Sequence, residues 1–460
     1  MPDFETNKKK ILMPVHDGTV TKNLLRTAFL KHLVDEGFFV VIIPPVGKEE
    51  SYREEFSKSD KVVVTNSLQE TDNFSENFFS GIFKHSIPTN FMKIRQVDWY
   101  WNEEKYLKYF FVSILRTLGH SKYWRRFLLK FNSLEPIPKE VKKLFKEVKP
   151  DLIFTPTMLT RLEVTLMRLG RKAGVPVIGM VKSFDNLTSK SFLRVHPDLL
   201  IVPNNTSISE ATKIYEYPTE KIRVTGICQY DAYANKEAVL EPREKFFTKL
   251  GLDPNRKTIL YAPAGDWMNP TDHETLRIIL DWIDDGTLPN TQVLLRLHPA
   301  YESKTESLNG HPNLVVERPG SHYGHLKTYE FDNADVTHLA SSLKHADLVI
   351  NTASTLMVEA SIFDTPVISL AFDGLQKLPY WKSVIRYYDR EHCVPIVSDS
   401  GMKLVKSQDD LKLAILDYLE KPELDKEGRK RIVETVAYRV DGKSCERTAK
   451  VLIDSIDIAG

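Results

Sequence analysis

His298 is followed directly by Pro299, and Arg296 lies two residues before it, within the apolar run 292–297. A proline restricts the residue before it to extended backbone, so His298 is expected at the end of a strand. An imidazole held there can donate a hydrogen bond to a phosphate oxygen. An ordinary turn residue at a strand end would give the same pattern, and the dipeptide alone does not separate the two interpretations.

A polar turn follows the apolar run 348–351, and Ser354 and Thr355 lie where a helical pattern then begins. Backbone N–H groups at a helix start, together with two hydroxyls, favour an anion. N-capping by a hydroxyl would explain the same residues without any ligand. Glu359 lies one helical turn further on, where it could reach a ribose or be solvated.

Two more loops follow apolar runs in this half of the chain. Residues 258–262 lead into a loop of small residues that contains Gly265 and Trp267, and residues 367–370 lead into a loop ending in Asp-Gly. Glycine allows close backbone approach, and an indole can stack on a base. Ligands of open parallel sheets bind beyond the carboxyl ends of the strands. Four strand ends of this kind predict a nucleotide site.

The elements that must position these residues alternate between strand and helix. Short apolar runs recur through both halves, as buried parallel strands require, with helical patterns between most of them. Such alternation predicts parallel sheets covered on both faces. We expect an α/β protein of two Rossmann-like domains whose sheets face a central cleft. The expected strands are residues 11–15, 38–44, 61–64, 151–154, 176–181, 199–202 and 222–226, then 258–262, 292–297, 314–317, 348–351 and 367–370.

The domain boundary is expected in the polar segment 230–242, which lacks periodicity. We predict a first domain over residues 1–230 and a second over 231–430. Residues 431–460 are helical and charged, and we expect them to return and brace the first domain. Residues 99–148 are predicted to form a helical insertion in the first domain.

The insertion is rich in aromatic residues, and Tyr106, Phe110, Phe111 and Leu115 are spaced along one side of a helix. Core packing of a helical pair is the expected reason for this spacing. A surface that faces an acceptor or a membrane is the alternative.

The composition sets limits on the class of protein. A hydrophobic fraction of 42%, a charged fraction of 27% and a net charge of +1 exclude a disordered chain and do not indicate a nucleic-acid partner. The three cysteines are far apart and match no metal spacing, which favours a reducing compartment. No apolar run approaches the roughly 20 residues of a spanning helix, and the first one is too short for a signal peptide. We expect a cytoplasmic protein without a metal or other cofactor, and leave open a peripheral association with the inner face of the cell membrane.

Several of these motifs together resemble a known family. They are Tyr261-Ala-Pro263, Arg296-Leu-His-Pro299, residues 346–355 with Glu359, Pro366-Val-Ile368, Asp441-Gly-Lys443, and Val224-Thr-Gly226 followed by Asp231. They resemble a bacterial superfamily that contains the CDP-glycerol glycerophosphotransferases of teichoic acid synthesis and related capsule and surface-polysaccharide transferases. The resemblance is good from about residue 220 onward and weak before residue 150.

The resemblance implies a GT-B fold, transfer without a metal, and a nucleotide held mainly by the second domain. It implies that His298 contacts the donor phosphate, that Ser354 and Thr355 cradle it, and that Arg296 adds charge or packs structurally. The family often has an Asp-Tyr-Ser-Ser turn where this chain has Asn-Thr-Ala-Ser-Thr up to Thr355. That difference leaves open whether the donor carries a sugar or a polyol phosphate.

Transfer to a hydroxyl also needs a general base, and the first half of the chain offers candidates. His16 and Asp17 directly follow the apolar run 11–15. Asp17 is the expected base and His16 the second choice, although an Asp-Gly pair is also typical of a plain turn.

A second polar loop follows residues 176–181 and carries Lys182, Asp185 and Asn186. Asp185 is a further candidate base. Lys182 or Asn186 could bind the donor or the acceptor, and simple solvation of the loop is the alternative.

We therefore expect a glycosyltransferase or related glycerophosphotransferase. It would move a sugar or polyol phosphate from a nucleotide-sugar or CDP-polyol donor to a glycan or lipid-linked glycan of a surface polysaccharide. The alternatives are a non-hydrolysing nucleotide-sugar 2-epimerase and a non-catalytic subunit that binds nucleotide sugar. The epimerases typically open with Gly-Thr-Arg-Pro-Glu after the first strand, where this chain reads His-Asp-Gly-Thr-Val from His16. No Gly-x-Gly-x-x-Gly follows that strand, which argues against a dehydrogenase.

Overall fold

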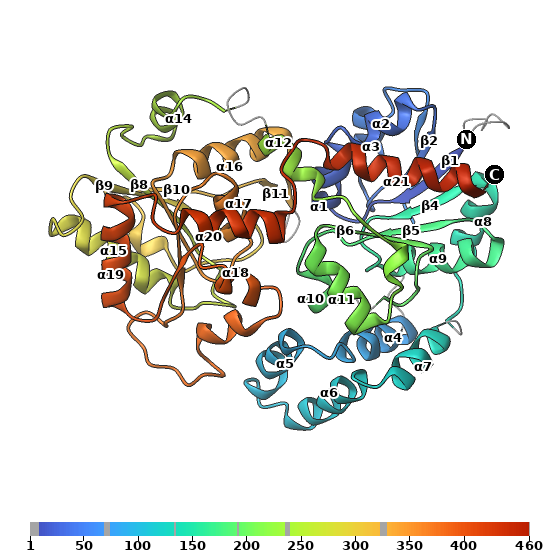
Figure 1. Cartoon of the computed structure of the whole chain (residues 1–460), viewed down its shortest axis with the longest axis horizontal. Helices are drawn as coiled ribbons and strands as arrows, with labels where there is room; N and C mark the ends of the chain where they lie inside the picture. The colour runs from blue at the N-terminus through green and yellow to red at the C-terminus, as the bar shows by residue number, and fades with distance from the viewer. Residues whose placement is uncertain are drawn as a thin grey trace. The chain divides into compact units, whose positions relative to one another are not determined.

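The chain folds into two compact units of the α/β class (Figure 1). A computed structural model describes residues 9–68, 74–132, 135–190, 193–234, 240–322 and 329–459. The first unit consists of Met1–Gln96, Glu104–Asp231 and Asp441–Gly460, and the second of Val97–Glu103 and Ala232–Val440.

The first unit is built on a parallel sheet, which has seven strands among the described residues. The strand order is β3-β2-β1-β4-β5-β6-β7, so the direction of winding changes between β1 and β4. In open parallel sheets, that switch point is where ligands bind. The strands are β1 (Lys10–Pro14), β2 (Phe39–Ile43), β3 (Val62–Val64), β4 (Leu152–Thr155), β5 (Val177–Met180), β6 (Leu199–Val202) and β7 (Ile222–Val224).

Both faces of this sheet are buried. Leu12 of β1 belongs to one apolar core, and its neighbours Ile11 and Met13 belong to the other, as the two-residue period of a strand requires. Continuous apolar strands are therefore stable here only because helices cover both faces. The helices associated with this sheet are α1 (Gly18–Val20), α2 (Phe29–Asp35), α3 (Glu49–Phe56), α8 (Lys139–Val148), α9 (Arg161–Ala173), α10 (Asn186–Ser189), α11 (Asn205–Tyr215) and α21 (Ser444–Ala459). The short helix α12 (Asp231–Ala234) begins at the last residue of this part of the first unit and continues into the second.

The helical insertion comprises α4 (Phe74–His85), α5 (Asn90–Gln96), α6 (Tyr106–Gly119) and α7 (Lys122–Asn132). A π-helical turn, Val97–Trp101, separates α5 from α6.

The expected core packing of Tyr106, Phe110, Phe111 and Leu115 is wrong for the three aromatic residues. Leu115 is buried, but Tyr106, Phe110 and Phe111 are exposed. The reason is that α6 packs through a different face, which includes Gly119. A Cβ atom at Gly119 would lie 1.9 Å from the carbonyl oxygen of Ser86, so only glycine allows this approach.

The second unit contains a second parallel sheet, which has six strands among the described residues, in the order β10-β9-β8-β13-β14-β15. All but β15 were predicted from the sequence. The strands are β8 (Lys257–Ala262), β9 (Thr291–Arg296), β10 (Leu314–Glu317), β13 (Leu348–Asn351), β14 (Val367–Leu370) and β15 (Lys403–Val405). A short antiparallel pair is formed by β11 (Ser321–His322) and β12 (Tyr329–Glu330). The helices are α14 (Arg243–Leu250), α15 (Asp272–Asp284), α16 (Asn333–His345), α17 (Leu356–Ile362), α18 (Val394–Ser398), α19 (Gln408–Glu420) and α20 (Lys426–Ile432).

The chain returns to the first unit at its last helix, α21, which packs against α2. The return is fastened by Asp231, whose two carboxylate oxygens accept hydrogen bonds from the backbone N–H groups of Ser444 (2.8 Å) and Cys445 (2.7 Å). Gly226 has φ +87°, and a Cβ there would lie 2.6 Å from the Ser444 hydroxyl. The segment up to Val440, including α20, is part of the second unit.

Candidate functional site

The first unit brings together three of the predicted residues at the carboxyl ends of its strands. Nε2 of His16 lies 3.0 Å from Oδ2 of Asp17, and Nζ of Lys182 lies 3.1 Å from the same oxygen. Oδ1 of Asp17 accepts a hydrogen bond from the N–H of Val20 (2.8 Å) and so caps α1. His16 and Asp17 follow β1 and Lys182 follows β5, so the sheet explains why residues far apart in sequence meet.

These contacts set the protonation of the pair. Burial alone would raise the pKa of Asp17, but the hydrogen bond from His16 and the charge of Lys182 outweigh it and hold that pKa well below the ordinary value. Burial opposes the charged form of His16, yet the hydrogen bond and charge of Asp17 raise its pKa above 6.5. Asp17 is therefore ionised, and it favours the protonated form of His16.

The second ring nitrogen of His16 is the unused group of this cluster. Nδ1 is buried and has no hydrogen-bond partner within the described part of the chain. With Nε2 donating to Asp17, Nδ1 carries the lone pair that can take a proton. The pairing is that of a histidine base oriented by a carboxylate.

Glu163 is a neighbour of this cluster that sequence reasoning missed. It is fully buried and accepts hydrogen bonds from the N–H groups of Thr157 (2.8 Å), Leu159 (3.0 Å) and Thr160 (3.1 Å), which fixes the loop between β4 and α9. Its charge also contributes to the raised pKa of His16. The signal was present as a capping box, Thr160-x-x-Glu163.

Asp185 and Asn186 lie at the start of α10, beyond β5. Oδ2 of Asp185 accepts a hydrogen bond from the hydroxyl of Ser189 (3.1 Å), a local contact within the turn. Asn186 is fully buried, and neither its amide nitrogen nor its amide oxygen has a hydrogen-bond partner among the residues described. A buried amide without partners is costly and rare, so Asn186 is a strong candidate to bind a ligand.

His298 follows β9 in the second unit, as its sequence predicts. Its Nδ1 accepts a hydrogen bond from the N–H of Ala300 (3.0 Å). Burial, and then the charge of Arg318, lower the pKa of His298 to about 4. The ring is therefore neutral near pH 7 with its proton on Nε2, which is the arrangement that donates a hydrogen bond to an anion.

An aromatic cluster surrounds His298. The ring of Tyr301 lies 4.6 Å from that of His298 and 5.2 Å from that of Trp267, which is exposed on the loop after β8. Gly265 has φ +87°, and a Cβ there would lie 2.6 Å from Cβ of Tyr301, so glycine is needed where the two loops pack. Tyr301 was not predicted, and its only signal was an aromatic residue close after the histidine.

Arg296 has a structural partner. It forms an ion pair with Glu317, its neighbour across β9 and β10, and Glu317 lies 2.6 Å from His338. Arg296 is buried in this network. Its contacts agree with the structural packing that was one of its two expected roles.

The turn after β13 presents Ser354 and Thr355 at the start of α17. The Ser354 hydroxyl accepts a hydrogen bond from the N–H of Leu356 (3.3 Å), whereas Thr355 stands at the N-cap position without a side-chain capping bond and is exposed. Ala353 adopts a left-handed conformation, φ +43°, and its N–H donates to the hydroxyl of Tyr388 (3.1 Å). Strained backbone of this kind, held by a buried partner, is typical of functional turns.

Glu359 lies on the buried side of α17. Its Oε1 accepts a hydrogen bond from the hydroxyl of Tyr233 (2.9 Å). The carboxylate is buried rather than solvated, because the side chain is only 7% exposed.

A buried network centred on Asp272 joins the strand-end loops of the second unit. Asp272 accepts hydrogen bonds from the N–H of Ala264 (2.8 Å) and the amide of Asn269 (2.7 Å), and that amide also donates to the hydroxyl of Thr352 (3.0 Å). Burial raises the pKa of Asp272 to about 7. The network ties the loop after β8 to the turn after β13. Sequence reasoning missed it, because an acid at a helix start carries no distinctive pattern.

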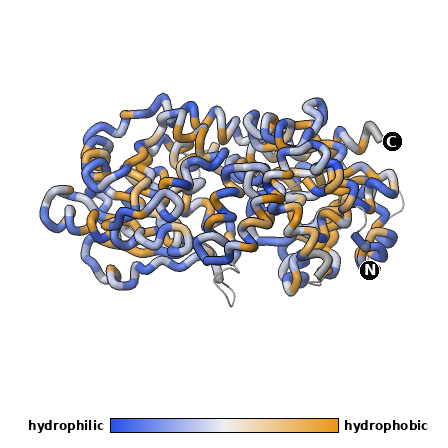
Figure 2. Tube along the Cα trace, turned by 90° about the horizontal axis from the view of Figure 1, so that it is seen from below, coloured by the Kyte–Doolittle hydropathy of each residue, from blue (hydrophilic) through white to orange (hydrophobic). Residues whose placement is uncertain are grey.

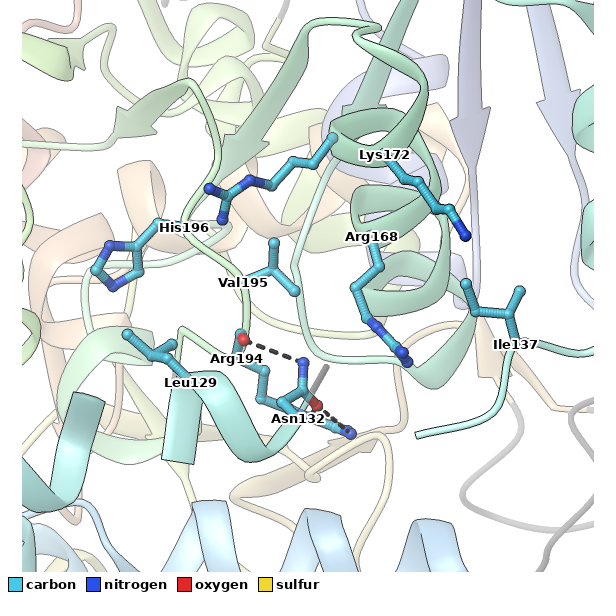
Figure 3. A pocket seen from close by; sticks show the side chains of 9 residues that line it. Leu129, Asn132, Ile137, Arg168, Lys172, Arg194, Val195 and His196 are labelled. Carbon is cyan, nitrogen blue, oxygen red and sulfur yellow. Dashed lines mark hydrogen bonds between the residues drawn. The ribbon is translucent and has the colours of Figure 1, made fainter. Parts of the chain in front are cut away.

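A cavity of about 470 Å³ lies elsewhere in the first unit, near the starts of β5 and β6 (Figure 3). Its lining includes Arg168, Arg171, Lys172 and Arg194. Two of these cations face the buried carboxylate of Glu135, at 2.9 Å from Arg194 and 3.9 Å from Arg168. Arg171 and Lys172 lie in the last turn of α9, where backbone carbonyls favour cations. The cavity lies near the amino ends of these strands, at the opposite end of the sheet from His16 and Lys182.

The described residues contain no group of three or more His, Cys, Asp and Glu side chains that could hold a metal ion. Within the same ranges, no helix is long and apolar enough to cross a bilayer.

The candidate residues of the two units suit different chemical tasks. The second unit offers a neutral imidazole, two hydroxyls and an exposed indole around strand-end loops, which suits a nucleotide with its phosphates. The first unit offers a histidine with a raised pKa and an oriented lone pair, which suits removal of a proton.

Comparison with known proteins identifies the family to which the sequence is similar. Residues 175–454 match the family model of the CDP-Glycerol:Poly(glycerophosphate) glycerophosphotransferases. Over 300 residues the chain is 24% identical to the teichoic acid ribitol-phosphate polymerase TarL of Staphylococcus aureus, covering 64% of this chain and 45% of TarL. It is 23% identical over 295 residues to the polymerase TarK of the same organism, covering 63% of this chain and 49% of TarK. The chain thus spans about half the length of the curated relatives it matches.

Solved structures share the fold over nearly the whole chain. The UDP complex of MnaA from S. aureus has a TM-score of 0.56 at 13% identity, covering 98% of this chain and 97% of that one. A glycosyltransferase from Rickettsia africae has a TM-score of 0.51 at 13% identity, covering 98% and 99%. At such identities the likeness shows the fold alone. With the two parallel sheets, it confirms the predicted GT-B fold.

Proposed function

Since the chain belongs to the CDP-Glycerol:Poly(glycerophosphate) glycerophosphotransferase family, we propose that it transfers a polyol phosphate from a CDP-linked donor to a hydroxyl of a cell-surface polymer. Family membership confirms the resemblance noted in the sequence. The matched residues, 175–454, include the segment Ala232–Val440 of the second unit, where the nucleotide is proposed to bind.

The observation that carries the proposal is the state of His298. A neutral imidazole whose Nδ1 is already occupied by Ala300 can only donate, from Nε2, and a phosphate oxygen only accepts. Thr355 adds a hydroxyl that caps nothing in its own helix. Trp267 and Tyr301 provide aromatic faces for a base.

The reaction can be written with these groups. Nδ1 of His16 takes the proton of the acceptor hydroxyl, and the oxygen attacks the phosphorus atom that carries the polyol. The new phosphate ester bond forms as the bond to the second phosphate breaks, and CMP leaves with that bond's electrons. His298 donates to the phosphate oxygens, where negative charge grows. Asp17 stabilises the imidazolium that forms on His16.

We further propose that the transfer needs no metal ion, so a chelator should leave the rate unchanged. The proposal also places the protein in the cytoplasm, at the inner face of the cell membrane, in keeping with three cysteines that are free and buried.

A thermal-shift panel of CMP, CDP, UDP, GDP, ADP and TDP tests the proposal. A ligand at 100 times its dissociation constant stabilises a protein by about 2.7 kcal/mol, which gives a clear shift. We expect CDP and CMP to raise the melting temperature and the other nucleotides to have little effect. A shift with UDP alone would contradict the CDP-linked donor and favour a nucleotide-sugar transferase.

Two controls separate the remaining alternatives. Mass spectrometry of donor incubated without acceptor detects epimerised nucleotide sugar, which would favour the 2-epimerase. Nucleotide binding without CMP release in the presence of acceptor would favour a non-catalytic subunit.

A further inference from the structure

The cavity of about 470 Å³ near the starts of β5 and β6 is lined by side chains of one charge (Figure 3). Four of its lining residues are cations, and none of the described lining residues is an aspartate or glutamate. The cations are Arg168, Arg171, Lys172 and Arg194. The formal net charge of the whole chain is only +1, so this is a local concentration of charge. A cavity lined in this way favours an anionic ligand.

The one buried carboxylate that contacts these cations is already shared. In Glu135, Oε1 lies 3.2 Å from Nε of Arg161, and Oε2 lies 2.9 Å from Nη2 of Arg194 and 3.9 Å from Nη1 of Arg168. A single negative charge thus faces three guanidinium groups, and among the described residues the cluster keeps a positive charge. Buried charge in excess is costly, and a bound anion would offset that cost.

Arg194 and Arg168 are held in place by the protein. The guanidinium of Arg194 donates to Oδ1 of Asn132 from Nε (3.2 Å) and from Nη2 (3.1 Å), and its Cζ lies 5.2 Å from the ring centre of Phe83. Arg168 donates to the backbone carbonyl of Glu135. Both side chains are largely buried. Cations fixed before a ligand arrives lose little entropy when it binds.

Arg171 and Lys172 add two cations on the exposed side of the cavity. They follow Arg168 by three and four positions along α9, so the three side chains share one face of the helix. Neither Arg171 nor Lys172 forms an ion pair within the described part of the chain. The carbonyls at a helix end favour cations there. They do not explain Arg168 one turn earlier, or Arg194 on another segment.

His196 supplies a hydrogen-bond donor to the same cavity. Its ring lies 5.4 Å from that of Tyr217, whose hydroxyl donates to the carbonyl oxygen of Pro197 (2.9 Å), so the ring is positioned by its neighbours. Burial, and then the charge of Arg171, lower the pKa of His196. The imidazole is therefore neutral near pH 7, with a proton on one ring nitrogen that it can donate.

The cavity also has an apolar part, formed by Leu129, Ile137 and Val195. Hydrophobic and hydrophilic segments alternate along the trace of the chain (Figure 2), and folding brings both kinds together here. Sites for small molecules typically have volumes of about 300–1,000 Å³ and combine apolar side chains with a few polar groups. A bare ion would use only the cations, whereas a ligand with a carbon skeleton would use the whole lining.

We propose that this cavity binds a small organic phosphate monoester, with its phosphate against Arg168, Arg171 and Lys172 and its carbon skeleton against the apolar side chains. Guanidinium groups match phosphate oxygens in geometry, and a monoester carries a charge of about −1.5 to −2 near pH 7. The cavity lies at the opposite end of the sheet from His16 and Lys182, so its ligand would leave those residues accessible. The proposal goes beyond the transfer reaction and does not depend on it.

Isothermal titration of the full-length chain with glycerol 3-phosphate tests the proposal. We expect binding that weakens as salt is added, weaker binding of inorganic phosphate, and no binding of glycerol. Arg171→Gln with Lys172→Gln should raise the dissociation constant about ten-fold or more, because hydrogen bonds to a charged group are lost. The melting temperature of this variant should match the wild type, because both side chains are exposed.

Two control variants show where the ligand binds. Lys142→Gln with Lys146→Gln removes the same charge from exposed positions of α8 in the same unit, and should leave the dissociation constant unchanged. His298→Ala should also leave it unchanged, because His298 belongs to the second unit, where the nucleotide is proposed to bind.

Any of five results would overturn the proposal. The first three are no heat of binding with glycerol 3-phosphate, an unchanged affinity in Arg171→Gln with Lys172→Gln, and an equal loss in the α8 variant. The fourth is inorganic phosphate binding as tightly as glycerol 3-phosphate, and the fifth is loss of binding in His298→Ala. None of these titrations uses a nucleotide, so failure here is distinct from failure of the proposed transfer.

Discussion

The imidazole of His16 and the carboxylate of Asp17 are neighbours in sequence and also partners in space, with Nε2 and Oδ2 3.0 Å apart. Asp17 is held further by Lys182 and by the N–H of Val20. A carboxylate with three partners and a depressed pKa is a weak base. The sequence predicts Asp17 as the base, with His16 as the second choice. We now propose that His16 takes the proton and that Asp17 is a positioning residue.

His16→Gln should lower kcat about 100-fold or more, as expected for loss of a general base. The Michaelis constant for the nucleotide donor should change little, because the nucleotide is proposed to bind to the second unit. Steady-state kinetics at saturating acceptor would measure both. Full activity of this variant would move the role of base to Asp185.

The pH dependence of kcat should report the His16–Asp17 pair. The base acts when unprotonated, so kcat should rise with pH through the raised pKa of His16. In Asp17→Asn the hydrogen bond and charge that raise this pKa are lost, so the rise should move to lower pH while the plateau falls. A profile that keeps its midpoint in Asp17→Asn would contradict the proposed roles.

His298→Ala should weaken nucleotide binding by about 1–3 kcal/mol, the cost of losing a hydrogen bond to a charged group. Isothermal titration with the nucleotide identified by the thermal-shift panel would measure it. His311→Ala is the matched control, because His311 pairs with Asp284 (3.0 Å) before β10 and should not affect binding. Unchanged affinity in His298→Ala would remove the group that carries the proposed function.

Asn186→Leu separates a ligand-binding role from a structural one. The buried amide has no partner among the described residues, so an apolar side chain of similar size should leave the melting temperature unchanged or raise it. The Michaelis constant for the acceptor should rise about ten-fold, the effect of one lost hydrogen bond. Asn132→Leu is the control, because its amide is bonded to Arg194 and its loss should destabilise the fold. A lower melting temperature of Asn186→Leu with an unchanged Michaelis constant would show that the amide of Asn186 has a structural role and does not bind a ligand.

Asp272 should make the free energy of unfolding depend on pH. Burial raises its folded-state pKa from 3.8 to about 7, so the folded protein holds a proton that the unfolded chain has lost. This contribution is full below about pH 4 and disappears as pH rises through about 7, for a total of about 3–5 kcal/mol. Urea unfolding of wild type and Asp272→Asn at several pH values would isolate it. If the free energy of unfolding changed with pH in the same way in both proteins, Asp272 would be ionised in the folded state.

The strands were predictable because burial on both faces makes each one a continuous apolar run. β15 was the exception, since Lys403–Val405 is short and begins with a charge. The buried side of the helices in the insertion was harder to predict. A stripe such as that of α6 has the same spacing whether it faces a core or solvent, and only the close approach of Gly119 to Ser86 decides which side is buried.

The positions of His16, Lys182 and His298 at strand ends were predictable, because each follows a continuous apolar run. The roles of those residues were not, because protonation depends on contacts made across the sheet. Glu163 and Asp272 act on the strand-end loops through several backbone N–H groups or amides at once. The capping-box spacing of Thr160 and Glu163 was visible in the sequence. The further partners of Glu163 and those of Asp272 meet only in the folded chain, so no spacing marks them.

The hydrogen bonds from the backbone of Ser444 and Cys445 to Asp231 also have a consequence for the order in which the chain folds during synthesis. Cys445, Ala449, Leu452 and Ile456 complete an apolar core whose other members lie mostly before residue 230. A ribosome must therefore synthesise the whole intervening sheet before that core can close. During translation, the apolar residues of the first unit that α21 covers stay exposed to solvent until α21 has been synthesised. A nascent chain released before that point would expose this surface to chaperones and proteases.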